Sequence, residues 1–363
     1  MKPADILRQR LHNQCLEGSL RSPQDVVRWL GAVQSQDFGG AAWAVCQRGH
    51  GSTLADFHEA FARGDLLRTH VMRPTWHFVA PEDIRWLLTL TAPRLLQAAH
   101  YYFKKYQLTD AILGRTGMLI SQALEGGKHL TRPEIATLLV SKNVDIRDQV
   151  HLAHIIIHAE ATGLICSGVP RGKQQTYALV SERAPNAITL TREEALAELA
   201  KRYFQSHGPA TLQDYTWWSG LTAADAAVGL QNSKANLISE TINDQTYWFT
   251  PPISTAPHST RVYLLPNYDE YIVAYADRSM VFDVHRYTDR LDSRQNPVFN
   301  NVIIIDGCIK GTWKPIVTRE TVNIEATLFM PLQEADRQVL AKAAKLYEKY
   351  VGMPVSIVNL SSP

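Results

Sequence analysis

The sequence of 363 residues contains little cysteine and no long apolar run. Its four cysteines stand far apart and form no Cys-x-x-Cys pair, so neither a disulfide framework nor a zinc ribbon is predicted, and we expect buried thiols in a reducing cytoplasm. No segment approaches the roughly 20 apolar residues that span a bilayer. The N-terminus has no hydrophobic segment of the signal-peptide kind. We therefore expect a cytoplasmic protein without a membrane partner, and the net charge of +2 neither requires nor excludes nucleic acid.

Signatures of metal and cofactor binding are also missing from the sequence. Of the thirteen histidines, His154 and His158 share one face of a predicted helix and His151 is near them. No His-Glu-x-x-His motif or neighbouring cysteine supports zinc binding by this group. No glycine-rich loop resembles a cradle for nucleotide phosphates. The sequence thus predicts neither a metal nor a cofactor.

A helical theme recurs along the chain, and its length predicts two to four domains. Thr131 to Glu134 form a capping box that opens a helix, and a second helix follows at 148–161. Two short strands, 164–166 and 176–180, then flank a polar, basic tip. Two helices followed by a hairpin are the outline of a winged helix.

The same theme recurs on both sides of this segment. Downstream, helices are predicted at 191–206, 212–218 and 222–230, the last two as a helix-turn-helix. The first hundred residues form a further copy, with helices near 3–15, 23–34 and 53–63 and strands at 67–70 and 75–79. After residue 260, β-rich runs occur at 262–265, 302–305 and 320–329, then a helix near 333–350 and a strand at 355–358. We predict an α+β protein of tandem winged-helix domains and a C-terminal β-barrel-like domain, with boundaries at 1–110, 111–185, 186–258 and 259–363.

The most informative motif is a pair of glutamines, Gln34 and Gln36, at the end of a predicted helix. Ser22 is placed to cap that helix, and Gly39-Gly40 are expected to stop it. Side chains at i and i+2 lie on the same side of an extended segment, so both amides could face one cleft where the helix unwinds. Two neutral amides can hold and orient a water molecule. The alternative is that the glutamines cap the helix by bonding its last carbonyl groups.

A second candidate element is the segment from Val71 to Val79. If it is extended, Arg73, Thr75 and His77 share one face, while Met72, Pro74, Trp76 and Phe78 share the other. The first face would then contact phosphate or a damaged base, with His77 also able to place the water. The alternative is a wing strand with a buried, hydrogen-bonded His77.

Further polar and aromatic residues have two interpretations each. The cations Arg171, Lys173, Arg290 and Arg294 either contact DNA or are merely solvated, and 286–301 is a candidate mobile loop. Asp269, Glu270 and Asp277 suit a paired-carboxylate hydrolase, but structural hydrogen bonding is the interpretation we favour. Trp217 and Trp218 are expected in the core rather than as a platform for stacking bases.

Segments from most of the chain resemble one known family. They are 30–36, 67–78, 207–211 with 217–221, 264–266 with 268–271, and 306–307 with 311–313. Together with the order of winged helices and a β-rich C-terminal part, they resemble the HTH_42 (formerly DUF1006) winged-helix family. That family is similar to the AlkZ-like bacterial DNA glycosylases, which remove alkylated purines and unhook interstrand crosslinks.

The resemblance implies an active site of the form Gln-x-Gln, which Gln34 and Gln36 match. The middle residue is aliphatic in the family, whereas Ser35 is small and polar. A sister branch has aspartate at the second polar position, so Gln36 places this chain nearer the AlkZ side.

Chemistry gives an independent reason why two amides would suffice. Cleavage of an N-glycosidic bond builds positive charge on the sugar, and a neutral base usually needs an acid to depart. A purine alkylated at N7 or N3 is already cationic, so the site needs only to hold water in line and stabilise the sugar cation. We therefore expect a monomeric DNA glycosylase that acts on alkylated double-stranded DNA of the bacterial nucleoid, through a shallow, open cleft.

Two other functions make different predictions. A non-catalytic winged-helix regulator would prefer one DNA sequence by at least about 10³-fold over random DNA. A protein-interaction scaffold would show no salt-dependent affinity for DNA.

Overall fold

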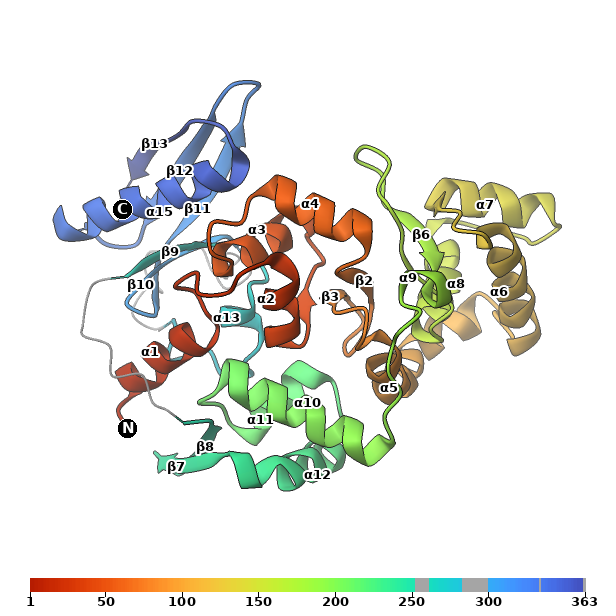
Figure 1. Cartoon of the computed structure of the whole chain (residues 1–363), viewed down its shortest axis with the longest axis horizontal. Coiled ribbons are helices and arrows are strands. Elements are labelled where there is room, and N and C mark those ends of the chain that lie inside the picture. The colour runs from red at the N-terminus through yellow and green to blue at the C-terminus, as the bar shows by residue number, and fades with distance from the viewer. Residues whose placement is uncertain (252–260, 283–299, 333, 362–363) are drawn as a thin grey trace.

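The computed structural model describes residues 1–251, 261–282, 300–332 and 334–361. The fold is mixed α+β, with helical parts in the middle, at the bottom and on the right of Figure 1 and a sheet at the upper left. The N-terminal elements are α1 (Pro3–Asn13), α2 (Pro23–Leu30), β1 (Val33–Gln34), α3 (Phe38–Arg48), α4 (Leu54–Arg63), β2 (Leu67–His70) and β3 (Trp76–Val79). The three strands form an antiparallel sheet in the order β1-β3-β2.

Helix α2 begins where the sequence predicts but ends earlier. Its N-cap is confirmed, since the Ser22 hydroxyl accepts the Asp25 main-chain N–H. The prediction that Gly39-Gly40 stop the helix is wrong, because Gly31 takes a φ of 79° and ends it at Leu30. This early stop leaves Val33-Gln34 free to form β1. The two later glycines lie inside α3, a helix that the sequence analysis missed.

The expected hairpin-bearing segment follows two unpredicted helices, α5 (Ile84–Lys105) and α6 (Asp110–Leu124). Its elements are β4 (Leu130–Thr131), α7 (Arg132–Ser141), α8 (Gln149–Ala161), β5 (Ile165–Ser167), β6 (Thr176–Leu179) and the short α9 (Val180–Arg183). The capping box at Thr131 is confirmed, and the strands pair in the order β4-β6-β5. Side chains such as Leu113, Ile135 and Ile155 form a core of their own.

The second predicted helix-turn-helix is also present. It consists of α11 (Leu212–Ser219) and α12 (Ala223–Ser233), preceded by α10 (Arg192–His207). A 3-10 turn η1 (Lys234–Asn236) and a hairpin of β7 (Ile238–Ile242) and β8 (Gln245–Phe249) follow. The core placement of Trp218 is confirmed by its burial, but that of Trp217 is wrong, because this residue is 46% exposed.

The C-terminal part is a five-stranded sheet with one long helix. Its elements are β9 (Val262–Leu265), α13 (Glu270–Val273), β10 (Val302–Ile305), β11 (Cys308–Val317), β12 (Val322–Leu328), α15 (Glu334–Val351) and β13 (Val355–Ser361). The order β13-β12-β11-β10-β9 is open, and a turn at Asp306-Gly307 joins β10 to β11.

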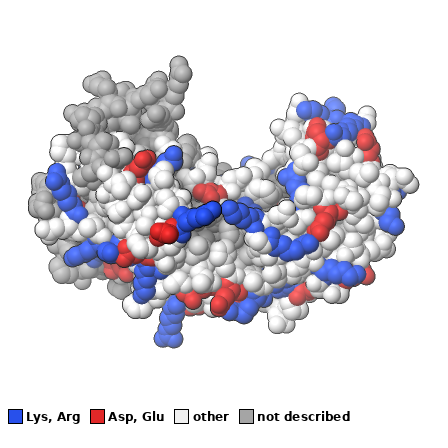
Figure 2. Space-filling model, turned by 90° about the horizontal axis from the view of Figure 1, so that it is seen from above, with Lys and Arg blue, Asp and Glu red and all other residues white. Residues whose placement is uncertain are grey.

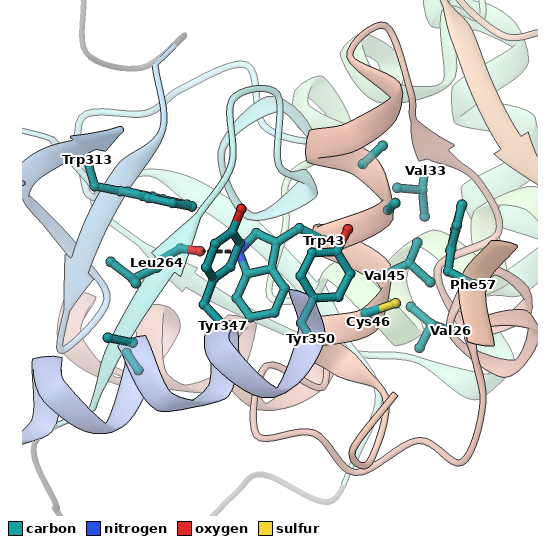
Figure 3. Packing of buried hydrophobic residues seen from close by; sticks show 14 of the residues in the cluster. Val26, Val33, Trp43, Val45, Cys46, Phe57, Leu264, Trp313, Tyr347 and Tyr350 are labelled. Carbon is teal, nitrogen blue, oxygen red and sulfur yellow. Dashed lines mark hydrogen bonds between the residues drawn. The ribbon is translucent and has the colours of Figure 1, made fainter. Parts of the chain in front are cut away.

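The N-terminal elements and this sheet share one hydrophobic core. Trp43 of α3 donates its indole N–H to the carbonyl of Leu264 in β9 at 2.6 Å. Its ring also lies 4.9 Å from the rings of Tyr347 and Tyr350 on α15 (Figure 3). The two ends of the chain therefore fold against each other, and this packing fixes the position of β1. Over the described residues, we find no helix that combines the length and apolar character needed to cross a membrane.

Candidate active site

Gln34 and His77 are directly opposite each other on β1 and β3, and Thr69 of β2 is opposite His77 on the other side. Side chains of directly paired residues lie on the same face of an antiparallel sheet. An amide, an imidazole and a hydroxyl are therefore neighbours on one face of this small sheet. Gln34 is 8% exposed, while His77 and Thr69 are fully buried.

Gln36 lies at the surface beyond the end of β1. The main-chain N–H of Ser35 donates to the carbonyl of Trp76 at 2.7 Å and continues the pairing by one residue. Gln36 is exposed and comes directly before Asp37, whose carboxylate caps α3. Neither glutamine side chain forms a hydrogen bond with any residue that the structure describes. The alternative in which they cap the helix is therefore wrong, because Gly31 ends α2 and both amides remain available.

The polar middle residue of the motif has a partner. Ser35 is fully buried, and the Arg68 guanidinium donates to its carbonyl at 2.8 Å and to its hydroxyl at 3.3 Å. The same guanidinium lies 4.4 Å from the ring centre of Trp76. Arg68 thus joins β2 to the motif through Ser35.

The segment before β3 does not have the predicted alternation. Met72 takes a left-handed φ of 64°, and the strand begins only at Trp76. Arg73 and His77 therefore do not lie on one face of a strand, because the chain turns between them. The alternative prediction, a buried and hydrogen-bonded His77, agrees with the geometry. The side chain is buried, and its Nδ1 lies 3.0 Å from the carbonyl of Thr75.

That hydrogen bond fixes the tautomer of His77, since a carbonyl requires the proton on Nδ1. The Nε2 atom then carries a lone pair, and it has no partner among the described residues. Burial and the nearby charge of Arg73 lower the pKa of His77 to about 3, so the imidazole is neutral at physiological pH. The site therefore has a neutral hydrogen-bond acceptor beside Gln34.

Further polar atoms around His77 also lack partners within the described part of the chain. They are the hydroxyls of Thr69 and Thr75 and the Nε and Nη2 atoms of Arg73. Buried polar atoms are normally hydrogen-bonded to protein or water. Their concentration next to Gln34 indicates a place that binds water or a polar ligand group.

A buried carboxylate lies behind the motif. Glu270 of α13 accepts the main-chain N–H of Gln34 at 2.7 Å and the indole N–H of Trp218 at 3.0 Å. Burial alone would raise its pKa, but His207, the charge of Arg73 and the N–H of Gln34 lower it to about 2. The preceding residue, Asp269, forms a buried ion pair with Arg48 at 2.8 Å. Both carboxylates thus have the structural bonding that we favoured, although the sequence did not reveal their partners.

The predicted DNA-contacting cations outside this centre have different surroundings. Arg171, near the tip of the β5–β6 hairpin, is paired with Glu134, whereas Lys173 is exposed. Arg290 and Arg294 lie outside the described residues. From above, Lys and Arg side chains run across the middle of this face (Figure 2).

A pocket of about 670 Å³ lies between α5, the α11–α12 pair and residues Met72 to Pro74. Neither glutamine lines it, and Trp217 is its single aromatic residue. This cavity is therefore not an aromatic pocket around Gln34. No group of three or more metal-ligating side chains occurs in the described ranges.

Comparison with known proteins agrees with this fold. The structure of Streptomyces sahachiroi DNA glycosylase AlkZ superimposes with a TM-score of 0.80 and 21% identity, covering 98% of this chain and 99% of that one, and so defines the fold. A protein of the same organism named interstrand DNA cross-link repair glycosylase is 23% identical over 338 residues, which are 86% of this chain and 87% of that protein. The family model for AlkZ-like DNA glycosylases matches residues 27–350. The chain belongs to the AlkZ-like DNA glycosylase family.

Proposed function

We propose that this protein hydrolyses the N-glycosidic bond of cationic alkylated purines in double-stranded DNA. The observation that carries the proposal is the pair Gln34 and Gln36, whose amides have no partner in the described structure. Gln34 is also directly opposite a neutral His77. Membership of a DNA glycosylase family supports the reaction class.

In the proposed reaction, the bond between C1′ and the purine nitrogen breaks, and its electron pair neutralises the positive charge of the purine. Water adds to C1′ and releases its proton to solvent. The oxygen atoms of the two amides orient the water and stabilise the sugar cation, while Nε2 of His77 accepts a hydrogen bond from the water. His77 is too buried to reach a phosphate on the surface, so we assign it to water rather than to the DNA backbone.

The leaving group explains why no acid is needed. Glu270 is ionised and His77 is neutral at physiological pH, so neither can protonate a departing base. Only purines that damage has already made cationic would then depart at a useful rate. We propose N7 and N3 adducts as substrates, including interstrand crosslinks because a relative is named for their repair.

We further propose that tandem winged helices at 1–110, 111–185 and 186–258 hold the duplex, followed by a barrel-like domain at 259–363. The central module has its own core, which supports its independence, whereas the first and last share theirs. Arg73 and Thr75 would contact the damaged nucleotide, and Arg171, Lys173, Arg290 and Arg294 the flanking backbone. We propose a monomer that acts on nucleoid DNA. A regulator without catalysis is not favoured in a glycosylase family.

The test is base release from duplex DNA that carries 7-methylguanine or a bulkier N7 adduct. Wild type should produce abasic sites only at the position of the lesion, and Gln34→Ala/Gln36→Ala should lose about 10² of the rate while still binding DNA. Gln97→Ala, at an exposed glutamine of α5, serves as the matched control and should be fully active. Absence of release from small and bulky adducts by a wild type that binds DNA would overturn the proposal.

A further inference from the structure

Strand β1 is an edge strand, and its outer side is held by a single buried carboxylate. Ser35 directs its N–H toward β3, so the preceding N–H, that of Gln34, points away from the sheet. There it donates to Oε1 of Glu270. A two-residue strand has few main-chain bonds, so this contact is a large share of what fixes it.

The other oxygen of Glu270 is held independently. Trp218 of α11 donates its indole N–H to Oε2, and Nε2 of His207, the last residue of α10, lies 3.5 Å from the same atom. Glu270 is 1% exposed. Strand β1, helix α11 and the end of helix α10 therefore meet at the carboxylate of Glu270, although they are distant in sequence. The contacts of all three depend on the position of this carboxylate.

We infer that Glu270 is a positioning residue for the glycosylase reaction, which fixes Gln34 through the main-chain N–H. The inference rests on the proposed function. A hydrogen bond to a charged group is stronger than one between two neutral groups. A catalytic group displaced by about 1 Å can lose about 10²-fold in rate. Loss of the carboxylate would therefore affect the chemical step through Gln34, although Glu270 itself is buried.

The two carboxylate oxygens of Glu270 accept from two different donors, the N–H of Gln34 and the indole N–H of Trp218. Replacement of Glu270 by glutamine is therefore informative. In Glu270→Gln, one amide oxygen can accept one N–H, but the amide NH₂ then faces the other donor. We expect a single-turnover rate of base release about 10²-fold below wild type at saturating enzyme, with lesion-DNA affinity within about threefold.

The neighbouring carboxylate is the matched control. Asp269 is equally buried, but it binds Arg48 and not β1. Asp269→Asn should lower the melting temperature, yet below its melting transition it should keep a rate within about threefold of wild type. Equal slowing of the two variants would overturn the inference, because it would indicate general loosening of α13.

A rescue experiment separates positioning from stability. Trp218→Phe removes the second donor, so in the double variant with Glu270→Gln the amide oxygen can turn to Gln34 and the NH₂ toward Nε2 of His207, which lies 3.5 Å from Oε2 of Glu270 in the wild type. We expect the rate of the double variant to exceed that of the single variant by at least about tenfold. A double variant as slow as the single one would contradict the inference.

If Glu270→Gln does not fold, Glu270→Asp replaces it. The charge remains, but the side chain is one methylene shorter and cannot reach both donors. A folded Glu270→Asp enzyme with the wild-type rate would overturn the inference. A wild type without base release on any adduct would instead refute the proposed function, so the two failures are distinguishable.

Discussion

Gln34 and His77 stand in register across β1 and β3, and the imidazole is kept neutral by burial and by the charge of Arg73. An amide and an uncharged imidazole therefore share one face of the sheet, with Nε2 unpartnered among the described residues. We therefore expect His77 to act in the chemical step, and exposed cations such as Lys173 to act in DNA binding.

His77→Phe tests the chemical side of this division. The ring fills the same space but removes Nε2, so the water would lose one hydrogen-bond partner. We expect single-turnover base release to slow by about 10- to 10²-fold and lesion-DNA affinity to change little. His58→Phe, at an exposed position, is the control. A large loss of affinity with an unchanged rate would show that His77 contacts DNA instead.

Lys173→Ala tests the binding side. Removal of one cation that neutralises a duplex phosphate lowers the slope of log affinity against log salt by about 0.9. Arg171 must leave Glu134 to reach a phosphate, so Arg171→Ala should change the slope less. Binding titrations at several salt concentrations measure both slopes. Identical slopes for wild type and Lys173→Ala would contradict a role of the hairpin tip in DNA binding.

Stability should fall on the acid side of neutrality. The pKa of folded His77 is about 3, against an ordinary value near 6.5, so the unfolded chain binds more protons between these values. The contribution of His77 is complete above pH about 6.5 and is lost toward pH 3, by up to about 1.4 kcal/mol per pH unit. Glu270, with a folded pKa of about 2, adds a loss in the same direction below its ordinary pKa of about 4.3.

Urea unfolding at pH 7.5, 6.5 and 5.5 measures this dependence. His77→Phe should show a flatter decline than wild type, while the exposed His58→Gln should not differ from it. A decline of equal steepness in His77→Phe would mean that other groups cause the acid sensitivity.

Ser35→Ala tests the role of the hydroxyl in the middle of the glutamine motif. The variant loses the hydroxyl that accepts from Arg68, but the Ser35 carbonyl still accepts the shorter of the two bonds. We expect a loss of about 1 kcal/mol in the free energy of unfolding and base release near the wild-type rate. Inactivity of a stably folded Ser35→Ala would indicate a direct role of the hydroxyl.

Local signals in the sequence were sufficient for much of the helical fold. Capping boxes at Thr131 and Thr191 and the left-handed Gly220 act within a few residues, so they are visible without tertiary contacts. The end of α2 was misplaced because three glycines follow in a short stretch and only the structure shows that Gly31 takes the positive φ.

The supports of the site were not predictable in the same way. Glu270 meets Gln34 across 236 residues, and Arg68 meets Ser35 across 33. Such contacts depend on how the sheet and helices pack. The sequence therefore placed the glutamine pair but not the groups that hold it.

The shared core of the chain ends has a consequence for the timing of activity during synthesis. Trp43 can pack against β9 and α15 only after both have been synthesised. The main-chain N–H of Gln34 can bond to Glu270 only after residue 270 has been made. A growing or truncated chain that stops earlier lacks a fixed site, even though its glutamine motif and much of its helical surface are present. A bond-cleaving activity on the genome would thus arise only in a nearly finished polypeptide.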